Sequence, residues 1–233
     1  MKTNYGNINE KRREDWIASQ LAAFPAGLKI LDAGAGELKY KKFCAHLQYT
    51  SQDFSQYNGQ GDGAGLQAAK WDVSKIDIVS DICDIPIGNE SFDAILCAEV
   101  FEHIPDPMLA IKEFHRLLKG GGKLIITAPF CSLTHFSPFH YYSGFNKFFY
   151  TTHLEKAGFE ILTLQTNGNY FEYLGQELQR LEEIAKEYSH CSFSFFQKKL
   201  IALLLSALAK LSRKDKGSSE LLCFGHHVLA KKK

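Results

Sequence analysis

The run Ile-Leu-Asp-Ala-Gly-Ala-Gly at residues 30–36 constrains the fold of this chain more than any other stretch. It is typical of an apolar strand that ends at Asp32 and is followed by Gly34 and Gly36. Glycine lets the backbone approach a ligand closely where a Cβ would clash, and residues 37–47 are compatible with a helix. The pattern therefore predicts a nucleoside-bearing cofactor across the carboxyl end of a strand.

The acidic residues of this turn distinguish between nucleoside cofactors. A dinucleotide fingerprint needs a third glycine at position 39, where this chain has Lys39. It would also not place Asp32 and Glu37 beside a pyrophosphate. S-adenosylmethionine carries an ammonium and a sulfonium but no phosphate, so an acidic turn is compatible with it. We therefore expect S-adenosylmethionine as the cofactor.

Two further predicted strands end in an acid. Gln52-Asp53 follows the strand-like residues 47–51, about twenty residues beyond the glycines, where an acid can accept both ribose hydroxyls. The alternative is a solvated acid at a strand end. Another strand ends at Asp81, and a further strand is predicted over residues 92–98.

Together these motifs resemble the class I S-adenosylmethionine-dependent methyltransferases related to quinone-biosynthesis and small-molecule methyltransferases. The resemblance covers roughly residues 28–166 and rests on ordered motifs: Leu31 to Gly36, Asp53, the Asp81 loop with Ile85-Pro86, Ser91-Phe92-Asp93, Glu99 to Ile104, and Leu117 to Leu124. Alternating strands and helices predict an α/β fold, a Rossmann-like, doubly wound, mostly parallel seven-stranded sheet with helices on both faces. The resemblance adds an antiparallel last strand, which a helical insertion precedes.

The same resemblance implies a cofactor site. Its predicted members are Asp32, Gly34, Gly36, Asp53, Phe54, Asp81, Ile82, Cys97, Ala98 and Glu99. The glycines would face the methionine moiety, Asp53 the ribose and Asp81 the adenine amino group, with the backbone of Ile82 beside the ring. Cys97 and Ala98 would line the sulfonium end, and Glu99 would orient the methionine end or the acceptor.

The chain departs from the family pattern at two places. Leu38 stands where a third glycine is common, so the helix predicted there would begin differently. Residues 58–65 are rich in glycine in place of a clear helix between the second and third strands. The adenine side of the site is therefore the least determined by sequence.

Composition favours a single domain. We expect an N-terminal helical cover over residues 1–27, the cofactor-binding core over 28–166, a helical insertion over 167–219 and the last strand over 220–233. The net charge of +1, from 27 basic and 26 acidic residues, provides no field for a polyanion, so nucleic acid is not an expected partner. The polar N-terminal residues and the lack of a long apolar run predict a cytoplasmic protein without a membrane span.

No metal ligands are apparent in the sequence. The six cysteines are dispersed without a CxxC pair or a His/Cys cluster at zinc spacing. His226 and His227 lack a third ligand at a suitable spacing. We therefore expect no metal site.

Residues 130–150 contain nine Phe or Tyr residues together with His135 and His140. This density follows the predicted fifth strand, at the edge where open sheets bind ligands, and is typical of a roof over an acceptor pocket. An aromatic core cluster under a loop explains the same pattern equally well. Ser143 is the expected cap of a helix that runs to Ala157.

Methyl transfer from a sulfonium is an in-line displacement, so the protein mainly supplies alignment and a dry cavity. If the acceptor loses a proton, a neutral imidazole is suited to take it. His103 is the first candidate because it follows the predicted fourth strand, although a structural histidine at a helix start is the alternative reading. Tyr142 and His140 are weaker candidates.

Residues 170–211 have apolar residues at spacings of three and four, which predict two helices. Three interpretations of their apolar faces are possible: the faces pack on one another, they form a homodimer contact, or they line a groove for a lipid-like acceptor. The sequence thus predicts an enzyme that methylates a small, partly apolar molecule, at oxygen. There are two alternatives. One is a non-catalytic module that holds a partner through the insertion, and the other is a methyltransferase that acts on protein or nucleic acid.

Overall fold

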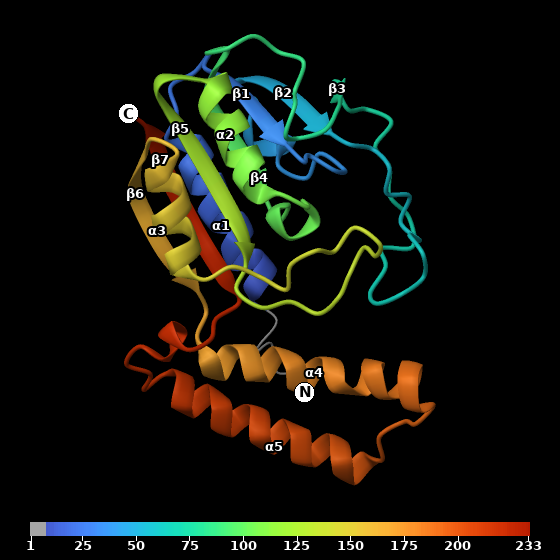
Figure 1. Ribbon diagram of the computed structural model, residues 1–233. Coiled ribbons are helices and arrows are strands. Elements are labelled where there is room, and N and C mark those ends of the chain that lie inside the picture. The colour runs from blue at the N-terminus through green and yellow to red at the C-terminus, as the bar shows by residue number, and fades with distance from the viewer. Residues whose placement is uncertain (1–7) are drawn as a thin grey trace. The chain divides into compact units, whose positions relative to one another are not determined.

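The computed structural model describes residues 8–233 (Figure 1), so residues 1–7 of the predicted N-terminal cover lie outside the described residues. The strands are β1 (Lys29–Ala33), β2 (Gln48–Asp53), β3 (Ile78–Val79), β4 (Phe92–Ala98), β5 (Leu118–Pro129), β6 (Phe159–Asn167) and β7 (Gly225–Lys232). The α-helices are α1 (Asn9–Ala22), α2 (Pro107–Leu117), α3 (Lys147–Lys156), α4 (Tyr170–Ser189) and α5 (Phe195–Ser212). Short 3-10 turns are η1 (Lys41–Phe43), η2 (Phe101–His103) and η3 (Ser218–Glu220).

The seven strands form one sheet in the order β3-β2-β1-β4-β5-β7-β6. The pairs from β3 through β5 are parallel, whereas β7 runs antiparallel to β5. From β1 the chain continues outward through β2 on one side and through β4 on the other, so the strand order reverses at this point. Open α/β sheets bind their ligands at the carboxyl ends of strands at such a point. The predicted fold class is confirmed.

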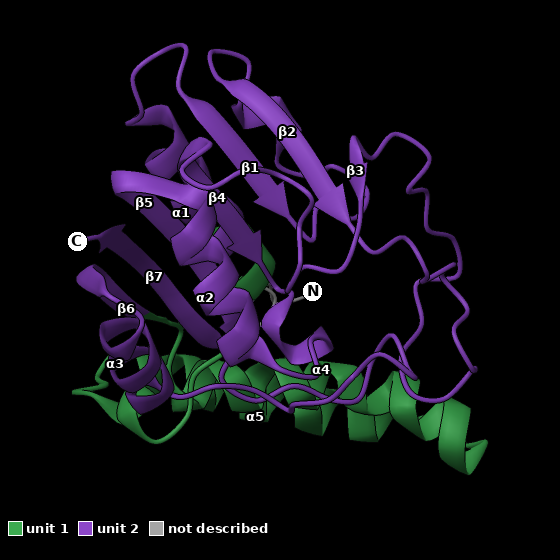
Figure 2. Ribbon diagram, turned by 45° about the horizontal axis from the view of Figure 1, so that its top comes forward, with its two compact units in different colours: residues 1–12, 166–224 green, residues 13–165, 225–233 purple. Residues whose placement is uncertain are grey.

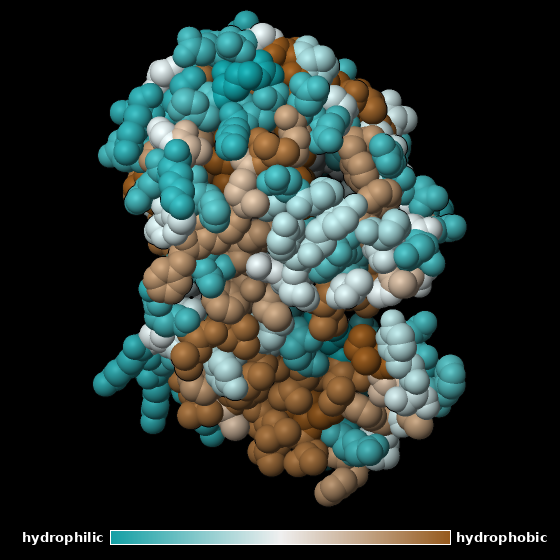
Figure 3. All heavy atoms as spheres, viewed as in Figure 1, coloured by the Kyte–Doolittle hydropathy of each residue, from teal (hydrophilic) through white to brown (hydrophobic). Residues whose placement is uncertain are grey.

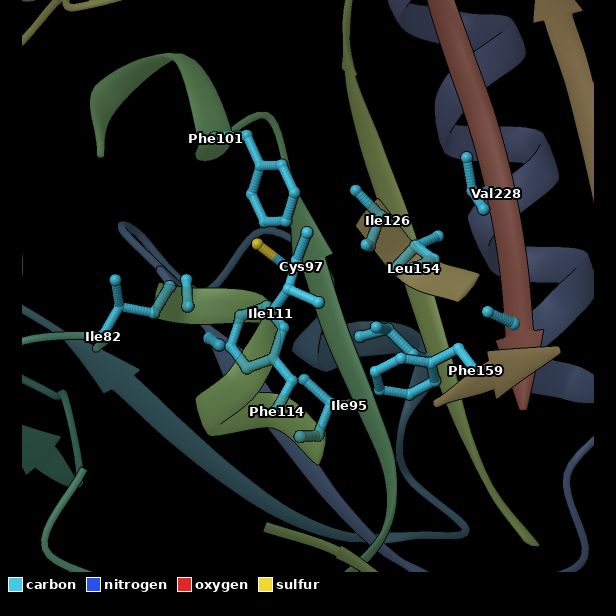
Figure 4. Packing of buried hydrophobic residues seen from close by; sticks show 14 of the residues in the cluster. Ile82, Ile95, Cys97, Phe101, Ile111, Phe114, Ile126, Leu154, Phe159 and Val228 are labelled. Atoms are coloured by element: carbon cyan, nitrogen blue, oxygen red, sulfur yellow. The ribbon is translucent and has the colours of Figure 1, made fainter. Parts of the chain in front are cut away.

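Alternate residues of the central strands lie on the two faces of the sheet, because successive side chains of a strand point to opposite sides. Ile30, Leu96 and Ile125 pack with Ile17 and Leu21 of α1 on one face. The other face packs against α2 and α3, and Figure 4 shows its central residues. The labelled members include Ile95, Cys97, Ile126, Ile111, Phe114 and Leu154. These two layers fix the carboxyl ends of β1 and β4.

The start of α2 is determined by two adjacent residues. The side chain of Asp106 accepts hydrogen bonds from the backbone N–H groups of Met108 and Leu109 at 3.0 and 3.1 Å. Pro107 occupies the first turn, where its missing N–H leaves no bond unmade. These two residues place the start of α2 at Pro107.

Two local predictions are wrong. Residues 37–47 form only the single turn η1 and no α-helix, since Leu38 adopts a left-handed φ of 61° that a continuous helix cannot include. The cap of α3 is Asn146 and not Ser143: the Asn146 side chain accepts from the N–H groups of Phe148 and Phe149. An asparagine directly before the first helical residue satisfies the free N–H groups that Ser143 is too far away to reach.

The described chain divides into two compact units (Figure 2). One contains residues 13–165 and 225–233, and the other contains residues 8–12 and 166–224. The prediction of a single domain from 1 to 233 stays a prediction. In the second unit, α4 and α5 pack on each other, and Lys198 on α5 contacts Glu182 on α4 at 2.8 Å. Both helices predicted for residues 170–211 are confirmed.

The outer face of α5 is apolar. Figure 3 shows brown side chains gathered over this helix. The most exposed of them are Phe195, Phe196 and Leu203, and only Leu205 of the helix is buried. No helix among residues 8–233 is both long enough and apolar enough to span a bilayer.

Candidate cofactor and acceptor site

The turn after β1 is fastened to the end of β2 by main-chain hydrogen bonds. The N–H groups of Gly34 and Ala35 donate to the carbonyl oxygen of Gln52 at 2.8 and 2.9 Å. The N–H of Gly36 donates to Oδ2 of Asp53 at 2.9 Å. We call this region, residues 32–36 with 52–55, the carboxyl edge. It brings together the first two parts of the predicted cofactor site.

The glycines of the carboxyl edge are required by backbone conformation and by protein neighbours. Gly34 and Gly36 have φ values of 75° and 50°, which side chains rarely adopt. A Cβ on Gly34 would lie 2.5 Å from Val100, and one on Gly36 would lie 2.7 Å from Trp71. Sequence reasoning attributed these glycines to a ligand alone, because it could not reveal that Val100 and Trp71 pack against them.

Asp53 has both carboxylate oxygens oriented. Its Oδ2 accepts from Gly36, and its Oδ1 accepts from the N–H of Ser55 at 2.8 Å. Each oxygen keeps a further lone pair, because a carboxylate offers about four acceptor positions. The next residue, Phe54, places its ring edge-on to Phe139 with centroids 4.9 Å apart. Asp53 is thus held in a fixed orientation with acceptor positions left on both oxygens.

Asp32 lies beneath the turn and is only 1% exposed. The hydroxyl of Tyr49 donates to its Oδ2 at 2.6 Å. Burial raises the pKa of Asp32 to about 7, because the cost of desolvating the charge exceeds the stabilisation by Tyr49. Within the carboxyl edge, Asp32 thus has a structural contact with Tyr49 of β2.

The predicted adenine and sulfonium residues lie at the ends of β3 and β4. Asp81 is exposed and accepts from the N–H of Cys83 at 2.8 Å, while Ile82 is buried in the core. The Cys97 side chain is fully buried against α2, as Figure 4 shows, and burial raises its pKa well above the usual range. Only the backbone of Cys97 is therefore placed to line a ligand. Ala98 packs toward the opposite layer.

Glu99 follows β4 in a strained conformation, with a left-handed φ of 57°. Its N–H donates to the carbonyl of Thr127, and its Oε2 accepts from Nη1 of Arg13 at 2.7 Å. Sequence reasoning missed Arg13, since 86 positions separate it from its partner. The ion pair fixes the carboxylate at the end of β4.

The segment of residues 130–145, here called the roof segment, is joined to the long loop between β2 and β3. Leu66 donates to the carbonyl of Thr134 and accepts from the N–H of Phe136. The Phe136 ring stacks on Tyr57 with centroids 4.6 Å apart and on His103 at 5.3 Å. The aromatic residues of the roof segment therefore connect this loop to η2 at the end of β4.

Two histidines of the roof segment, His135 and His140, lie close to His103 of η2. The ligand-capable ring nitrogens of His103, His135 and His140 all lie within 4.8 Å of one another. Nδ1 of His103 is hydrogen-bonded to the carbonyl of Phe139, so this nitrogen carries the proton and Nε2 the lone pair. Burial, and then the neighbouring His135, lower the pKa of His103 to about 3. Such a depressed pKa weakens the reason for choosing His103 as a base.

The other two catalytic candidates have different surroundings. Burial and His135 lower the pKa of His140 as well, and the two rings lie 4.7 Å apart. The hydroxyl of Tyr142 donates to the carbonyl of Pro105 at 3.0 Å. The structure thus brings His103 and His140 together and directs Tyr142 elsewhere. All three catalytic roles stay predictions.

Comparison with known proteins identifies the family. Residues 31–126 match the family described as "Methyltransferase domain". The ubiquinone biosynthesis O-methyltransferase of Xanthomonas oryzae pv. oryzae is 33% identical over 118 residues, 49% of this chain and 48% of that protein. The chain thus matches about half the length of this curated relative.

Solved structures share the fold. An S-adenosylmethionine-dependent methyltransferase from Archaeoglobus fulgidus superposes with a TM-score of 0.56 at 16% identity, covering 99% of this chain and 100% of that chain. Phosphoethanolamine N-methyltransferase 2 of Haemonchus contortus, in complex with S-adenosylmethionine, gives 0.55 at 18% identity, covering 95% and 52%. Residues 31–126 are therefore a methyltransferase domain, and the fold is that of S-adenosylmethionine-dependent methyltransferases. The family and cofactor predicted from the sequence are confirmed, whereas the roles of individual residues stay predictions.

Proposed function

We propose that this chain transfers the methyl group of S-adenosylmethionine to an oxygen atom of a small-molecule acceptor. The observation that carries the proposal is the carboxyl edge, where the turn after β1 is bonded to Asp53 at the point of strand-order reversal. Asp53 and Glu99 suit the hydroxyls and positive charges of this cofactor, and acids in these places would repel phosphates. The residues present therefore fit the family's cofactor.

The chain's contribution to the reaction is positioning. S-adenosylmethionine supplies an activated methyl group when bound, so alignment accounts for much of the catalysis. In this proposal Asp53 accepts from the ribose hydroxyls, and Glu99 orients the methionine end or the acceptor. Hydrogen bonds from Ser55 to Asp53 and from Arg13 to Glu99 support these roles by fixing the two carboxylates. The backbone of Cys97 and Ala98 borders the sulfonium end. The candidates for the group that takes the acceptor's proton are His103, His140 and Tyr142.

The choice of an oxygen acceptor is supported by the O-methyltransferase similarity, at 33% identity over half of the chain. The aromatic rings of the roof segment favour a partly apolar acceptor, since flat rings pack on such groups. A hydroxylated aromatic ring combines both properties. The acceptor class that we propose is therefore a phenol or hydroxylated quinone.

A turnover assay tests the proposal. Purified protein is incubated with S-adenosylmethionine carrying a labelled methyl group and with phenols, hydroxylated quinones or sugars, and the methylated product is identified by mass spectrometry. We expect O-methylation of a phenolic acceptor, which at limiting cofactor is slower in Asp53→Ala and unchanged in Asp72→Asn, an exposed acid outside the site. Cofactor binding without turnover on any acceptor, alongside a stable complex with a protein partner, would favour the non-catalytic module instead.

Two further properties are proposals from the sequence. A homodimer through the insertion is supported by the exposed apolar face of α5, on which Leu203 is 67% exposed. Light scattering should show a dimer that Leu203→Glu dissociates, and a monomeric wild type would contradict it. The cytoplasmic location stays a prediction.

A further inference from the structure

A buried carboxylate lies beside two of the three clustered histidines, His103 and His135. Oε1 of Glu102 is 3.8 Å from Nε2 of His103 and 3.9 Å from Nε2 of His135. These separations exceed a hydrogen bond, yet they are close to the spacing of atoms that share a metal ion. Two ligands bound to Zn²⁺ at about 2.0–2.2 Å in a tetrahedron lie about 3.3–3.6 Å apart.

The histidine rings are oriented as metal ligands commonly are. A metal-binding histidine usually donates its second ring N–H to a carbonyl or carboxylate, which fixes the ring and its tautomer. Nδ1 of His103 is bonded to the carbonyl of Phe139, and Nδ1 of His135 to that of Leu133 at 2.9 Å. Both rings therefore present Nε2 toward Glu102.

The carboxylate supplies an independent indication. Glu102 is 1% exposed, and its Oε2 has no hydrogen-bond partner within residues 8–233. An ionised carboxylate that is buried without a partner costs free energy, and a coordinated cation removes this cost. The main-chain carbonyl of the same residue accepts from Tyr141 and Tyr142, which holds the roof segment against η2.

We propose that His103, His135, His140 and Glu102 form a binding site for one divalent transition-metal ion, for which Zn²⁺ is the probe. Three imidazoles and one carboxylate form a donor set suited to such ions and unlike the all-oxygen sites of Mg²⁺ or Ca²⁺. The main-chain N–H of His135 donates to Nδ1 of His140 at 3.3 Å, a long hydrogen bond. That bond breaks when His140 turns its ring to the ion.

The ion joins two segments that are distant in the sequence. His103 and Glu102 belong to η2 after β4, whereas His135 and His140 belong to the roof segment after β5. Coordination orders the roof segment at the end of β4. It also occupies the lone pair of His103, so His103 cannot act as the base while the ion is bound.

Zinc titration of the full chain, after treatment with a chelator and without S-adenosylmethionine, tests this inference independently of methyl transfer. Calorimetry should show one equivalent of Zn²⁺ bound, with a rise in the thermal midpoint, and Co²⁺ should give the visible absorption of a tetrahedral site. His135→Gln and Glu102→Gln should each lower the affinity by more than the roughly 10–100-fold that loss of a partner behind a metal ligand costs. His190→Asn, at an exposed left-handed position that asparagine tolerates, should leave it unchanged.

Three outcomes would overturn the inference. The first is no Zn²⁺ binding by folded wild-type protein. The second is binding that survives both His135→Gln and Glu102→Gln, with circular dichroism showing that these variants are folded. The third is binding lost only on replacing the exposed Cys131 and Cys191 by serine, which would place the ion on surface thiols.

Discussion

The carboxyl edge and the roof segment are neighbours in the fold but are built in different ways. At the carboxyl edge, main-chain N–H groups of Gly34, Ala35 and Gly36 are bonded to the end of β2. The roof segment is held largely by side chains, through rings stacked on Phe136 and histidines clustered around His135. One region depends on backbone conformation, and the other depends on the identity of its side chains.

This difference indicates which region determines cofactor specificity and which determines acceptor specificity. Backbone hydrogen bonds restrict the carboxyl edge to a few glycine-rich sequences, which suits a cofactor shared by a family. Side chains of the roof segment can change while its backbone persists, which suits recognition of a particular acceptor. We infer that cofactor binding responds to changes at Asp53, and acceptor choice to changes around Phe136.

The largest effect is expected where the roof segment rests on the core. Phe101 is fully buried in η2, and its ring contacts those of Phe114, Phe145 and Phe149. Phe101→Ala should lower the free energy of unfolding by about 3–5 kcal/mol, because the cavity cannot close fully. Denaturant titration measures the change, and Phe148→Ala, at a position 66% exposed, is the control. Equal stability of the two variants would show that the roof segment does not depend on this ring.

A smaller effect is expected at the carboxyl edge. Asp53→Ala removes the acceptor for the ribose and for the N–H groups of Gly36 and Ser55. Affinity for S-adenosylmethionine should fall by about 1–3 kcal/mol, and by less in Asp53→Asn, which keeps one oxygen. Calorimetry decides the matter, and unchanged affinity in the alanine variant would refute the assignment of Asp53.

The buried Asp32 of the carboxyl edge should make the free energy of unfolding depend on pH. Because the pKa of Asp32 is raised to about 7, the folded protein holds one more proton than the unfolded chain between about pH 4 and 7. This residue therefore makes the free energy of unfolding decrease by about 1.4 kcal/mol per pH unit as the pH rises through that range.

Asp32→Asn should flatten this slope relative to wild type. Denaturant titrations at several pH values in the absence of cofactor measure it. Identical slopes in the two proteins would mean that Asp32 is ionised throughout.

The smallest effect is expected after the roof segment, at the start of α3. Asn146→Ala should destabilise the protein by about 1 kcal/mol, because two N–H groups lose their acceptor. Ser143→Ala should have little effect, since Ser143 is not the cap. Thermal unfolding compares the two, and a larger loss in Ser143→Ala would reverse the assignment.

The sequence predicted the parts of the molecule that local patterns determine. The strand over residues 92–98 and the turn with Gly34 and Gly36 follow from short apolar runs and glycine spacing. The prediction of a helix over residues 37–47 is wrong because Leu38 takes a left-handed conformation, which helix propensity does not reveal.

The less predictable parts depend on contacts across the fold. Arg13 reaches Glu99 across 86 positions, and His103 meets His135 only when η2 and the roof segment come together. A search for metal ligands by sequence spacing cannot find residues that only the tertiary fold unites. The sequence-based expectation of no metal site therefore takes no account of the cluster of His103, His135 and His140.

Calorimetric titration with S-adenosylmethionine and S-adenosylhomocysteine, with NAD and ATP as controls, tests whether this site binds S-adenosylmethionine. We expect micromolar binding of the first two compounds and no binding of the controls, with binding weakened in Asp53→Ala. Binding of NAD or ATP in preference to S-adenosylmethionine, or no binding of any of these by well-folded protein, would contradict it.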